Sequence, residues 1–501
     1  MRDFLKNGLL MLATVAACTA VAEGIARWAD AGGGEDVARR LDEVPRAPGV
    51  ERAWYFSNPP SLSNRGPVPA AWDELVRRVE RSGITEGTRR ADMFKAWNTA
   101  LVGDPCQHPY LRDAPGHLFV YDPPSDGLTG GRPHPPYRFL PNATTPIGLV
   151  TNAYGFRGPP VPFVRTPKTI RIAFVGASTT VDDHHLAYSY PEFVGHWLNL
   201  WAASKRLDIR FEVLNAGRES INSVDIEEIV RQEVLPLRPD LIIYYEGANQ
   251  FDLRTVVPSV PKPDPFARPA TSPPQSFVSR WLGEFALVRR VRALLRSIDG
   301  PADRAAGGGE WPKPDYDIVW PAGLDETDPD IGRADLPINL STILGNLDRI
   351  RAAAQAEGGE LALASFVWLV KDGMMLDPIR HRSILEYLNR GYAPFRYRDL
   401  ERMAAFENRV FAKYARAHRL AFLDVARLMP RDPDLFVDAI HNTQTGVRLK
   451  AWVVLQELMP LVERNLANGT WPKADPGTGM PARHPAFAVP PRPLEFACKK
   501  T

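Results

Sequence analysis

The sequence predicts a three-layer αβα protein, in which a parallel sheet of five strands carries helices on both faces. Short apolar runs alternate along the chain with longer stretches of helical periodicity. This alternation is typical of repeated βαβ units, which form parallel sheets. The runs are largely apolar along their whole length, as expected for strands that are covered on both faces. Together the two patterns indicate a flavodoxin-like arrangement of strands and helices.

The predicted elements follow one another in order, with one long interruption. The core occupies residues 167–252 and 341–468, and the segment between them, 253–340, is rich in proline. An insertion of that length is either functional, as a lid, a substrate wall or a membrane-facing flap, or a tolerated surface excursion. Proline-rich regions flank the core at 31–166 and 469–501. We expect strands at 170–175, 211–214, 241–245, 361–369 and 420–425, and helices at 190–203, 226–235, 343–356, 400–418 and 447–466.

Composition excludes several classes of protein. The chain of 501 residues has 61 Lys and Arg against 59 Asp and Glu, a net charge of +2. It therefore lacks the basic excess with which proteins bind nucleic acid. Hydrophobic residues make up 44% and charged residues 24% of the chain, which is ordinary for a globular protein. The three cysteines, Cys18, Cys106 and Cys498, are too few for a disulfide scaffold or a zinc ribbon.

The N-terminus carries an export signal. Arg2 and Lys6 precede an apolar run from Gly8 to Ala22, and basic residues before such a run are typical of exported proteins. Three fates remain open: cleavage after Ala22, lipid attachment at Cys18, or retention of residues 1–30 as a membrane anchor, which we favour. Each of them places the rest of the chain outside the cytoplasm, in the periplasm or beyond.

Export would place the two remaining cysteines in a compartment where disulfides can form. In an oxidising compartment Cys106 and Cys498 could form a disulfide between the N-terminal region and the C-terminal tail. They could equally be unrelated thiols, because the sequence does not bring their Cα atoms within bonding distance.

Polar residues stand where the predicted strands end. Ser178, Gly217 and Asn249 follow the first three strands, while Asp438 and His441 precede the last helix. In doubly wound sheets, ligands bind beyond the carboxyl ends of the strands. A carboxylate three residues before an imidazole can bind one ring nitrogen and leave the other as a base. Each motif alone is compatible with a helix cap or a polar loop, but the four in this order predict a nucleophilic hydrolase site.

These motifs resemble the conserved blocks of the SGNH (GDSL-like) hydrolases, a superfamily of esterases and lipases. Gly176-Ala177-Ser178, Asn215-Ala216-Gly217, Gly247-Ala248-Asn249 and the Asp438 and His441 pair match the first, second, third and fifth blocks. The resemblance covers about residues 169–466. The apolar N-terminus and the lead-in Gly155-Phe156-Arg157-Gly158 are similar to a bacterial, membrane-tethered subgroup. Ala177 and Gln250 depart from the family, which usually has Asp at both positions.

The resemblance implies a role for each motif. Ser178 would be the nucleophile, His441 its base and Asp438 the carboxylate that orients the imidazole. The oxyanion would be held by the backbone N–H groups of Ser178 and Gly217 and by the side chain of Asn249. No metal or organic cofactor is expected. The residues expected to contact the substrate are Thr179, Asp183, His184, Gln250 and Trp368.

The implied function is a serine esterase that acts outside the cytoplasmic membrane. Its substrate would be an acyl or acetyl ester of a lipid, a glycan or a small molecule. Two alternatives use the same scaffold: an O-acyltransferase that modifies an envelope polysaccharide, and a catalytically silent binding module of the envelope. The sequence does not indicate an oligomeric state, and fold alone would not separate these functions.

Overall fold

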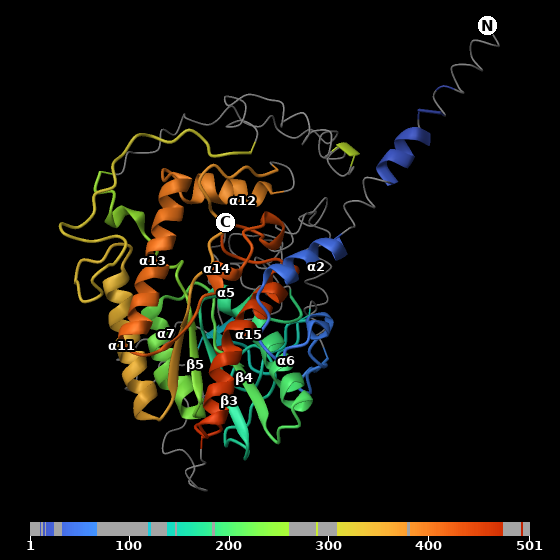
Figure 1. Ribbon diagram of the computed structural model, residues 1–501, viewed down its shortest axis with the longest axis vertical. Coiled ribbons are helices and arrows are strands. Elements are labelled where there is room, and N and C mark those ends of the chain that lie inside the picture. The colour runs from blue at the N-terminus through green and yellow to red at the C-terminus, as the bar shows by residue number, and fades with distance from the viewer. Residues whose placement is uncertain are drawn as a thin grey trace, which may run out of the picture.

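A parallel sheet of five strands lies at the centre of the computed structural model (Figure 1). The strand order is β4–β3–β5–β6–β7, and every pairing between neighbours is parallel. Counted along the chain, this order is 2-1-3-4-5, which is that of flavodoxin-like sheets. The predicted fold class is therefore confirmed. The strands are β3 (Thr169–Gly176), β4 (Arg210–Asn215), β5 (Leu241–Tyr245), β6 (Glu360–Ala364) and β7 (Ala421–Leu423).

The structure describes the core and several flanking segments. The described residues are 33–67, 138–145, 148–182, 186–259, 308–377 and 381–473, with the short pieces 11, 14–15, 17–24, 119–121, 287–288 and 492–493.

Helices cover both faces of the sheet. On one face α6 (Tyr190–Ser204) packs against α15 (Gln444–Ala467). On the other, α11 (Leu340–Ala356) lies between α7 (Ser223–Ile229) and α13 (Tyr397–Ala417). All residues of β3 and β5 are buried, because helices cover the sheet from both sides.

Local sequence determines where the helices next to the site begin. Ser189 and Glu192 form a capping box at the start of α6, in which Glu192 Oε2 accepts the backbone N–H of Ser189 at 2.7 Å. Asn222 caps α7 by accepting the backbone N–H of Val224 at 2.9 Å. Thr443 caps α15 by accepting the N–H of Gly446 at 3.2 Å. These caps satisfy backbone donors that the first turn of a helix leaves unpaired.

Two predicted elements differ most from the structure in extent. The predicted strand 361–369 ends as β6 at Ala364, because its neighbour β7 is only three residues long. The apolar run continues beyond it, but its backbone donates to other groups: the N–H of Phe366 to Asn408 Oδ1 at 2.7 Å, and that of Leu369 to the Ala439 carbonyl at 2.9 Å. The predicted helix 226–235 extends from Ser223 to Leu237, with its last two turns in π and 3₁₀ geometry.

The last part of the insertion, residues 308–340, lies along α13 and is bound to it by ion pairs. Glu326 forms ion pairs with Arg402 at 2.6 Å and Arg409 at 3.3 Å, and Asp328 pairs with Lys413 at 2.7 Å. This part therefore forms a fixed wall over α13. The remainder of the predicted lid, residues 260–286 and 289–307, lies outside the described residues.

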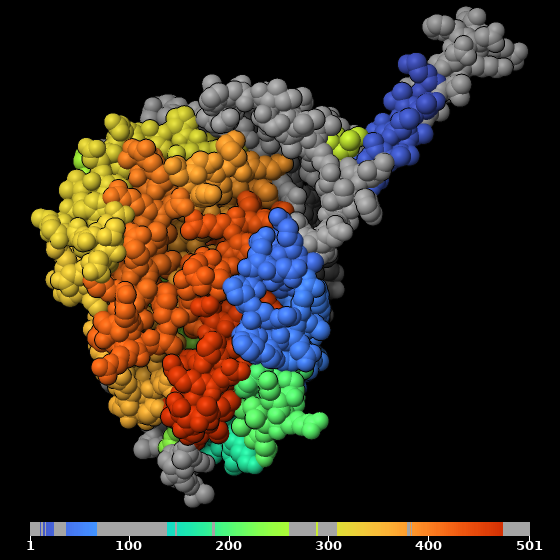
Figure 2. All heavy atoms as spheres, viewed as in Figure 1, coloured from blue at the N-terminus to red at the C-terminus, as the bar shows by residue number. Residues whose placement is uncertain are grey.

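The N-terminal region packs on the core at the opposite side. Helix α2 (Gly33–Glu43) and the 3₁₀ turn η1 (Arg52–Phe56) lie against α15 and α6, where Figure 2 shows them as the blue surface. Arg448 of α15 donates to the Tyr55 carbonyl at 2.9 Å, and Gln456 Oε1 accepts the N–H of Ala47 at 2.8 Å.

A small antiparallel sheet joins distant parts of the chain. Its strand order is β2–β1–β8, from β1 (Phe119–Tyr121), β2 (Arg138–Phe139) and β8 (Arg492–Pro493). The C-terminal tail is thereby paired with the N-terminal region. Cys106 and Cys498 themselves lie outside the described residues. Within those residues, no helix combines the length and apolar character needed to cross a bilayer.

Candidate active site

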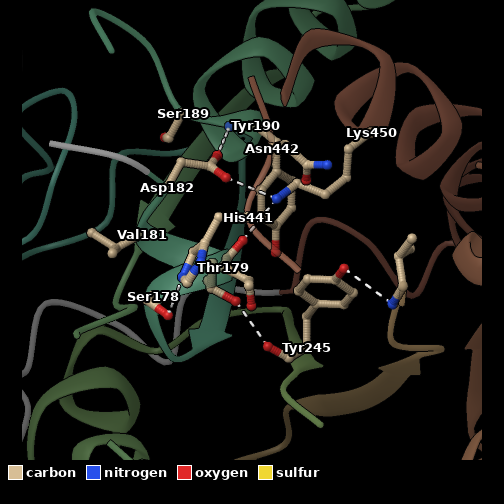
Figure 3. A network of polar contacts seen from close by, with 12 residues as sticks. Ser178, Thr179, Val181, Asp182, Ser189, Tyr190, Tyr245, His441, Asn442 and Lys450 are labelled. Atoms are coloured by element: carbon tan, nitrogen blue, oxygen red, sulfur yellow. Dashed lines mark hydrogen bonds and ion pairs between the residues drawn. The ribbon is translucent and has the colours of Figure 1, made fainter. Parts of the chain in front are cut away.

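Ser178, His441 and Asp438 form a continuous chain of hydrogen bonds. His441 Nε2 lies 2.8 Å from Ser178 Oγ, and His441 Nδ1 lies 2.8 Å from Asp438 Oδ2 (Figure 3 shows the serine and the imidazole). Ser178 is the first residue of α5 (Ser178–Val181), directly after β3, and His441 lies just before α15. The arrangement has the geometry of a nucleophile, a base and an orienting carboxylate.

Asp438 is held in its ionised form by the turn in which it lies. Its second oxygen, Oδ1, accepts the backbone N–H groups of Ile440 at 2.9 Å and His441 at 2.8 Å. Burial alone would raise the pKa of Asp438, but the His441 imidazole and these hydrogen bonds outweigh it and lower the pKa. A carboxylate at this place stabilises the imidazolium that forms when His441 accepts a proton.

The loops of the second and third motifs each have a position with room only for glycine. At Gly217, an added Cβ would lie 2.6 Å from the backbone nitrogen of Val181 and 3.0 Å from Thr180 Cβ. At Gly247, it would lie 2.7 Å from Phe366 Cβ. The glycines of the second and third motifs therefore allow close packing of the loops around the nucleophile.

Two of the three predicted oxyanion donors, Gly217 and Asn249, have hydrogen-bond partners within the protein. The N–H of Gly217 donates to Asn215 Oδ1 at 3.1 Å, within its own loop. Asn249 Nδ2 donates one hydrogen to the Ile221 carbonyl at 2.6 Å. Because an amide nitrogen carries two hydrogens, the second remains for a ligand. Of the two, Asn249 is therefore better placed than Gly217 to stabilise an oxyanion.

Two carboxyl groups near the triad were missed by sequence reasoning: Glu246, which is buried, and Glu219, which is partly exposed. Glu246 Oε1 accepts the backbone N–H groups of Ala248 at 2.9 Å and Asn249 at 2.7 Å, which fixes the turn that presents Asn249. Burial raises the pKa of Glu246 to about 7. Burial also raises the pKa of Glu219 to about 7, against the opposing effect of His441. A single glutamate in a loop forms no recognisable sequence motif, so only the fold shows that Glu219 and Glu246 lie near the triad.

Three predicted contact residues have structural partners. Thr179 is 3% exposed, and its carbonyl accepts from Lys450 Nζ at 2.7 Å. Gln250 Oε1 accepts the N–H of Ser223 at 2.8 Å, at the start of α7. Trp368 is also 3% exposed, and its ring contacts that of Phe251 in a tilted arrangement with 4.5 Å between the ring centres. Thr179 and Trp368 are buried, whereas Gln250 is partly exposed.

The remaining predicted contacts, Asp183 and His184, lie outside the described residues. The described part of the chain contains no group of three or more His, Cys, Asp or Glu side chains arranged to hold a metal ion.

Fold and site together define an α/β protein with a Ser–His–Asp constellation at the carboxyl edge of a doubly wound sheet. No protein-family model and no curated protein matches the chain. Among solved structures it is similar to a lipase/acylhydrolase from Enterococcus faecalis, with 14% identity over 58% of this chain and 96% of that one, and a TM-score of 0.31. It is also similar to an acetylxylan esterase from Geobacillus stearothermophilus (14% identity, 58% and 94% covered, TM-score 0.28). A GDSL-like lipase from Bacteroides thetaiotaomicron is similar at 12% identity (59% and 88% covered, TM-score 0.26).

Proposed function

We propose that the protein is a serine esterase of the SGNH hydrolase type, with Ser178 as its nucleophile. One observation carries the proposal: His441 Nε2 lies 2.8 Å from Ser178 Oγ while its other ring nitrogen is bound to ionised Asp438. A serine hydroxyl is a weak nucleophile until a base accepts its proton. The order of the four sequence motifs supports the same assignment.

The reaction follows from this geometry. As Ser178 Oγ attacks the ester carbonyl carbon, His441 Nε2 accepts the hydroxyl proton, and Asp438 stabilises the resulting imidazolium. The carbonyl oxygen becomes an oxyanion that Asn249 can bind through its side-chain amide. His441 then donates the proton to the leaving alkoxide, and an acyl group remains on Ser178. Water attacks this acyl-enzyme with His441 again as base, which releases the acid and restores the serine.

We further infer that residues 1–30 tether the catalytic domain to the outer side of the cytoplasmic membrane. Two basic residues, Arg2 and Lys6, precede the apolar run, and only Arg27 follows it within residues 1–30; this basic excess on the N-terminal side supports the placement. Carbonate extraction of membranes from cells that express the full chain tests it. A protein of full mass in the membrane pellet is the expected result. A shortened soluble protein would indicate cleavage, and a lipid-bearing fragment that begins at Cys18 would indicate a lipoprotein.

The esterase assignment is tested with the full chain and two short esters. Wild type, Ser178→Ala and the control Ser204→Ala, at the end of α6, are compared on p-nitrophenyl acetate and butyrate, and each is treated with a fluorophosphonate. We expect hydrolysis and labelling in wild type and control, and neither in Ser178→Ala. Labelling without hydrolysis would favour the acyltransferase. A wild type that neither labels nor hydrolyses would contradict the proposal and favour the binding module.

A further inference from the structure

The helix that carries Ser178 depends on other elements for its hydrogen bonds. Helix α5 has four residues, and within it the N–H groups of Thr180 and Val181 both donate to the Ala177 carbonyl. A helix of this length has no donors of its own for its later carbonyls. Side chains supply them: Lys450 Nζ donates to the Thr179 carbonyl at 2.7 Å, Asn215 Nδ2 to that of Thr180 at 3.1 Å, and Arg157 Nη1 to that of Val181 at 3.0 Å.

All three donors are buried, and Lys450 also binds the residue that follows α5. The Lys450 side chain is 1% exposed and forms an ion pair with Asp182 Oδ1 at 2.7 Å. The ammonium lies 4.5 Å from the centre of the Tyr190 ring and 5.5 Å from that of Tyr245. Two N–H donors are thus used by oxygen atoms, and the charge faces aromatic rings. Figure 3 shows Lys450 reaching the carboxylate of Asp182.

Asp182 extends this link to the next helix. Its second oxygen, Oδ2, accepts the backbone N–H of Tyr190, the first residue of α6, at 2.6 Å. The backbone of Asp182 has a φ of 58°, which is unfavourable for a residue other than glycine. The carboxylate therefore joins the end of α5, the start of α6 and Lys450 of α15 at one point.

Stability alone does not account for a buried pair of this kind. Desolvation of both charges offsets much of their attraction, so apolar side chains of similar volume often stabilise a protein as well or better. What the pair supplies is a defined geometry at its place in the fold. Helix α15 begins at Gln444, three residues after His441, and also carries Lys450. One rigid helix thus connects the base to the turn that bears the nucleophile.

We propose that Lys450, together with Asp182, is a positioning residue that fixes Ser178 Oγ relative to His441. The proposal rests on the esterase function proposed above. Among the described residues, Lys450 has no hydrogen bond or ion pair with Ser178 Oγ or the imidazole, and it acts through the Thr179 carbonyl. A displacement of the nucleophile of about 1 Å can lower a rate by about 100-fold.

The test compares full-length wild type with Lys450→Met, which keeps the volume of the side chain, and with Asp182→Asn. On p-nitrophenyl acetate we expect kcat to fall roughly 10- to 100-fold in Lys450→Met, with KM within about twofold of wild type. The rate constant of fluorophosphonate labelling at Ser178 should fall by a similar factor. Lys450→Arg should recover part of the loss, because guanidinium can also donate to both oxygens.

A matched control separates positioning from general loss of stability. Arg165 pairs with buried Asp240 at 2.8 Å, at the amino edge of the sheet away from Ser178. Arg165→Met should lower the melting temperature but leave the labelling rate constant at the wild-type value. If folded Lys450→Met also labels at the wild-type rate, the proposal is wrong. If Lys450→Met does not fold, unchanged kcat and labelling in Asp182→Asn would overturn it. A wild type that does not label at all would instead overturn the esterase function.

Discussion

Nε2 of His441 lies 2.8 Å from Oγ of Ser178, although 263 positions separate the two residues in the chain. The topology of the sheet brings them together. Ser178 follows β3, an interior strand of the sheet, and His441 precedes α15, which packs on α6, the next long helix after Ser178. The carboxyl ends of parallel strands lie at one edge of the sheet, so functional residues that are far apart in the sequence lie close together there.

Asp438→Asn should abolish most of the activity without unfolding the protein. The amide cannot stabilise the His441 imidazolium as the carboxylate does, so we expect kcat to fall by about 10³- to 10⁴-fold with little change in KM. Steady-state hydrolysis of p-nitrophenyl acetate measures this. Asp348→Asn, on the outer helix α11, serves as the control and should retain full activity. A loss of less than tenfold in Asp438→Asn would show that the carboxylate does not orient the base.

Asn249→Ala should lower the rate by removing an oxyanion donor. The Asn249 amide keeps one hydrogen beyond its bond to the Ile221 carbonyl. Loss of one such donor typically reduces kcat by about 10²- to 10³-fold. Kinetics on acetate and butyrate esters should show the same factor for both, because the oxyanion does not depend on acyl length. A change confined to KM would contradict this role and indicate a substrate contact.

Alanine should have opposite effects at two glycines. At Gly217 the new Cβ would lie 2.6 Å from the Val181 nitrogen, so Gly217→Ala should displace α5, lower the free energy of unfolding by about 1–3 kcal/mol and reduce activity. At Gly345, within α11, the nearest atom is the flexible Arg349 Nη1 at 3.9 Å. Gly345→Ala should therefore stabilise the protein by up to about 1 kcal/mol. Urea unfolding of both variants provides the comparison, and equal effects would contradict the packing described here.

Glu246 should make the protein less stable as the pH rises through the weakly acidic range. Burial raises its pKa in the folded state to about 7, so between its ordinary pKa and about 7 the folded state holds a proton that the unfolded state has released. The free energy of unfolding must then decrease with rising pH, by at most about 1.4 kcal/mol per pH unit for this group.

Glu246→Gln removes that ionisation while its amide oxygen can still accept the backbone N–H groups of Ala248 and Asn249. The difference in unfolding free energy between the variant and wild type should therefore grow in favour of the variant between about pH 5 and about pH 7.5. Urea unfolding at both values measures it. Parallel stability curves for the two proteins would show that Glu246 does not titrate in this range.

Much of the fold followed from local patterns in the sequence. The run 241–245 forms β5 with the predicted bounds, and the helices at 190–203 and 447–466 differ from α6 and α15 by a few residues at most. These elements are long or uniformly apolar, so burial and periodicity define them. The strand predicted at 361–369 is longer than β6, because apolar character indicates that residues are buried but not that they pair with a neighbouring strand. Its second half is buried by loops and side chains instead of by a neighbouring strand.

The sequence by itself determined the order of strands and helices, and it identified Ser178, Asp438 and His441 as candidates. It could do so because each motif is a short pattern next to a recognisable strand or helix. Only the tertiary structure decided that Gly217 uses its N–H within its own loop, that Glu246 supports Asn249, and that Lys450 reaches the turn of Ser178. These relationships depend on distances between side chains of different elements. Packing sets such distances, and no local pattern encodes them.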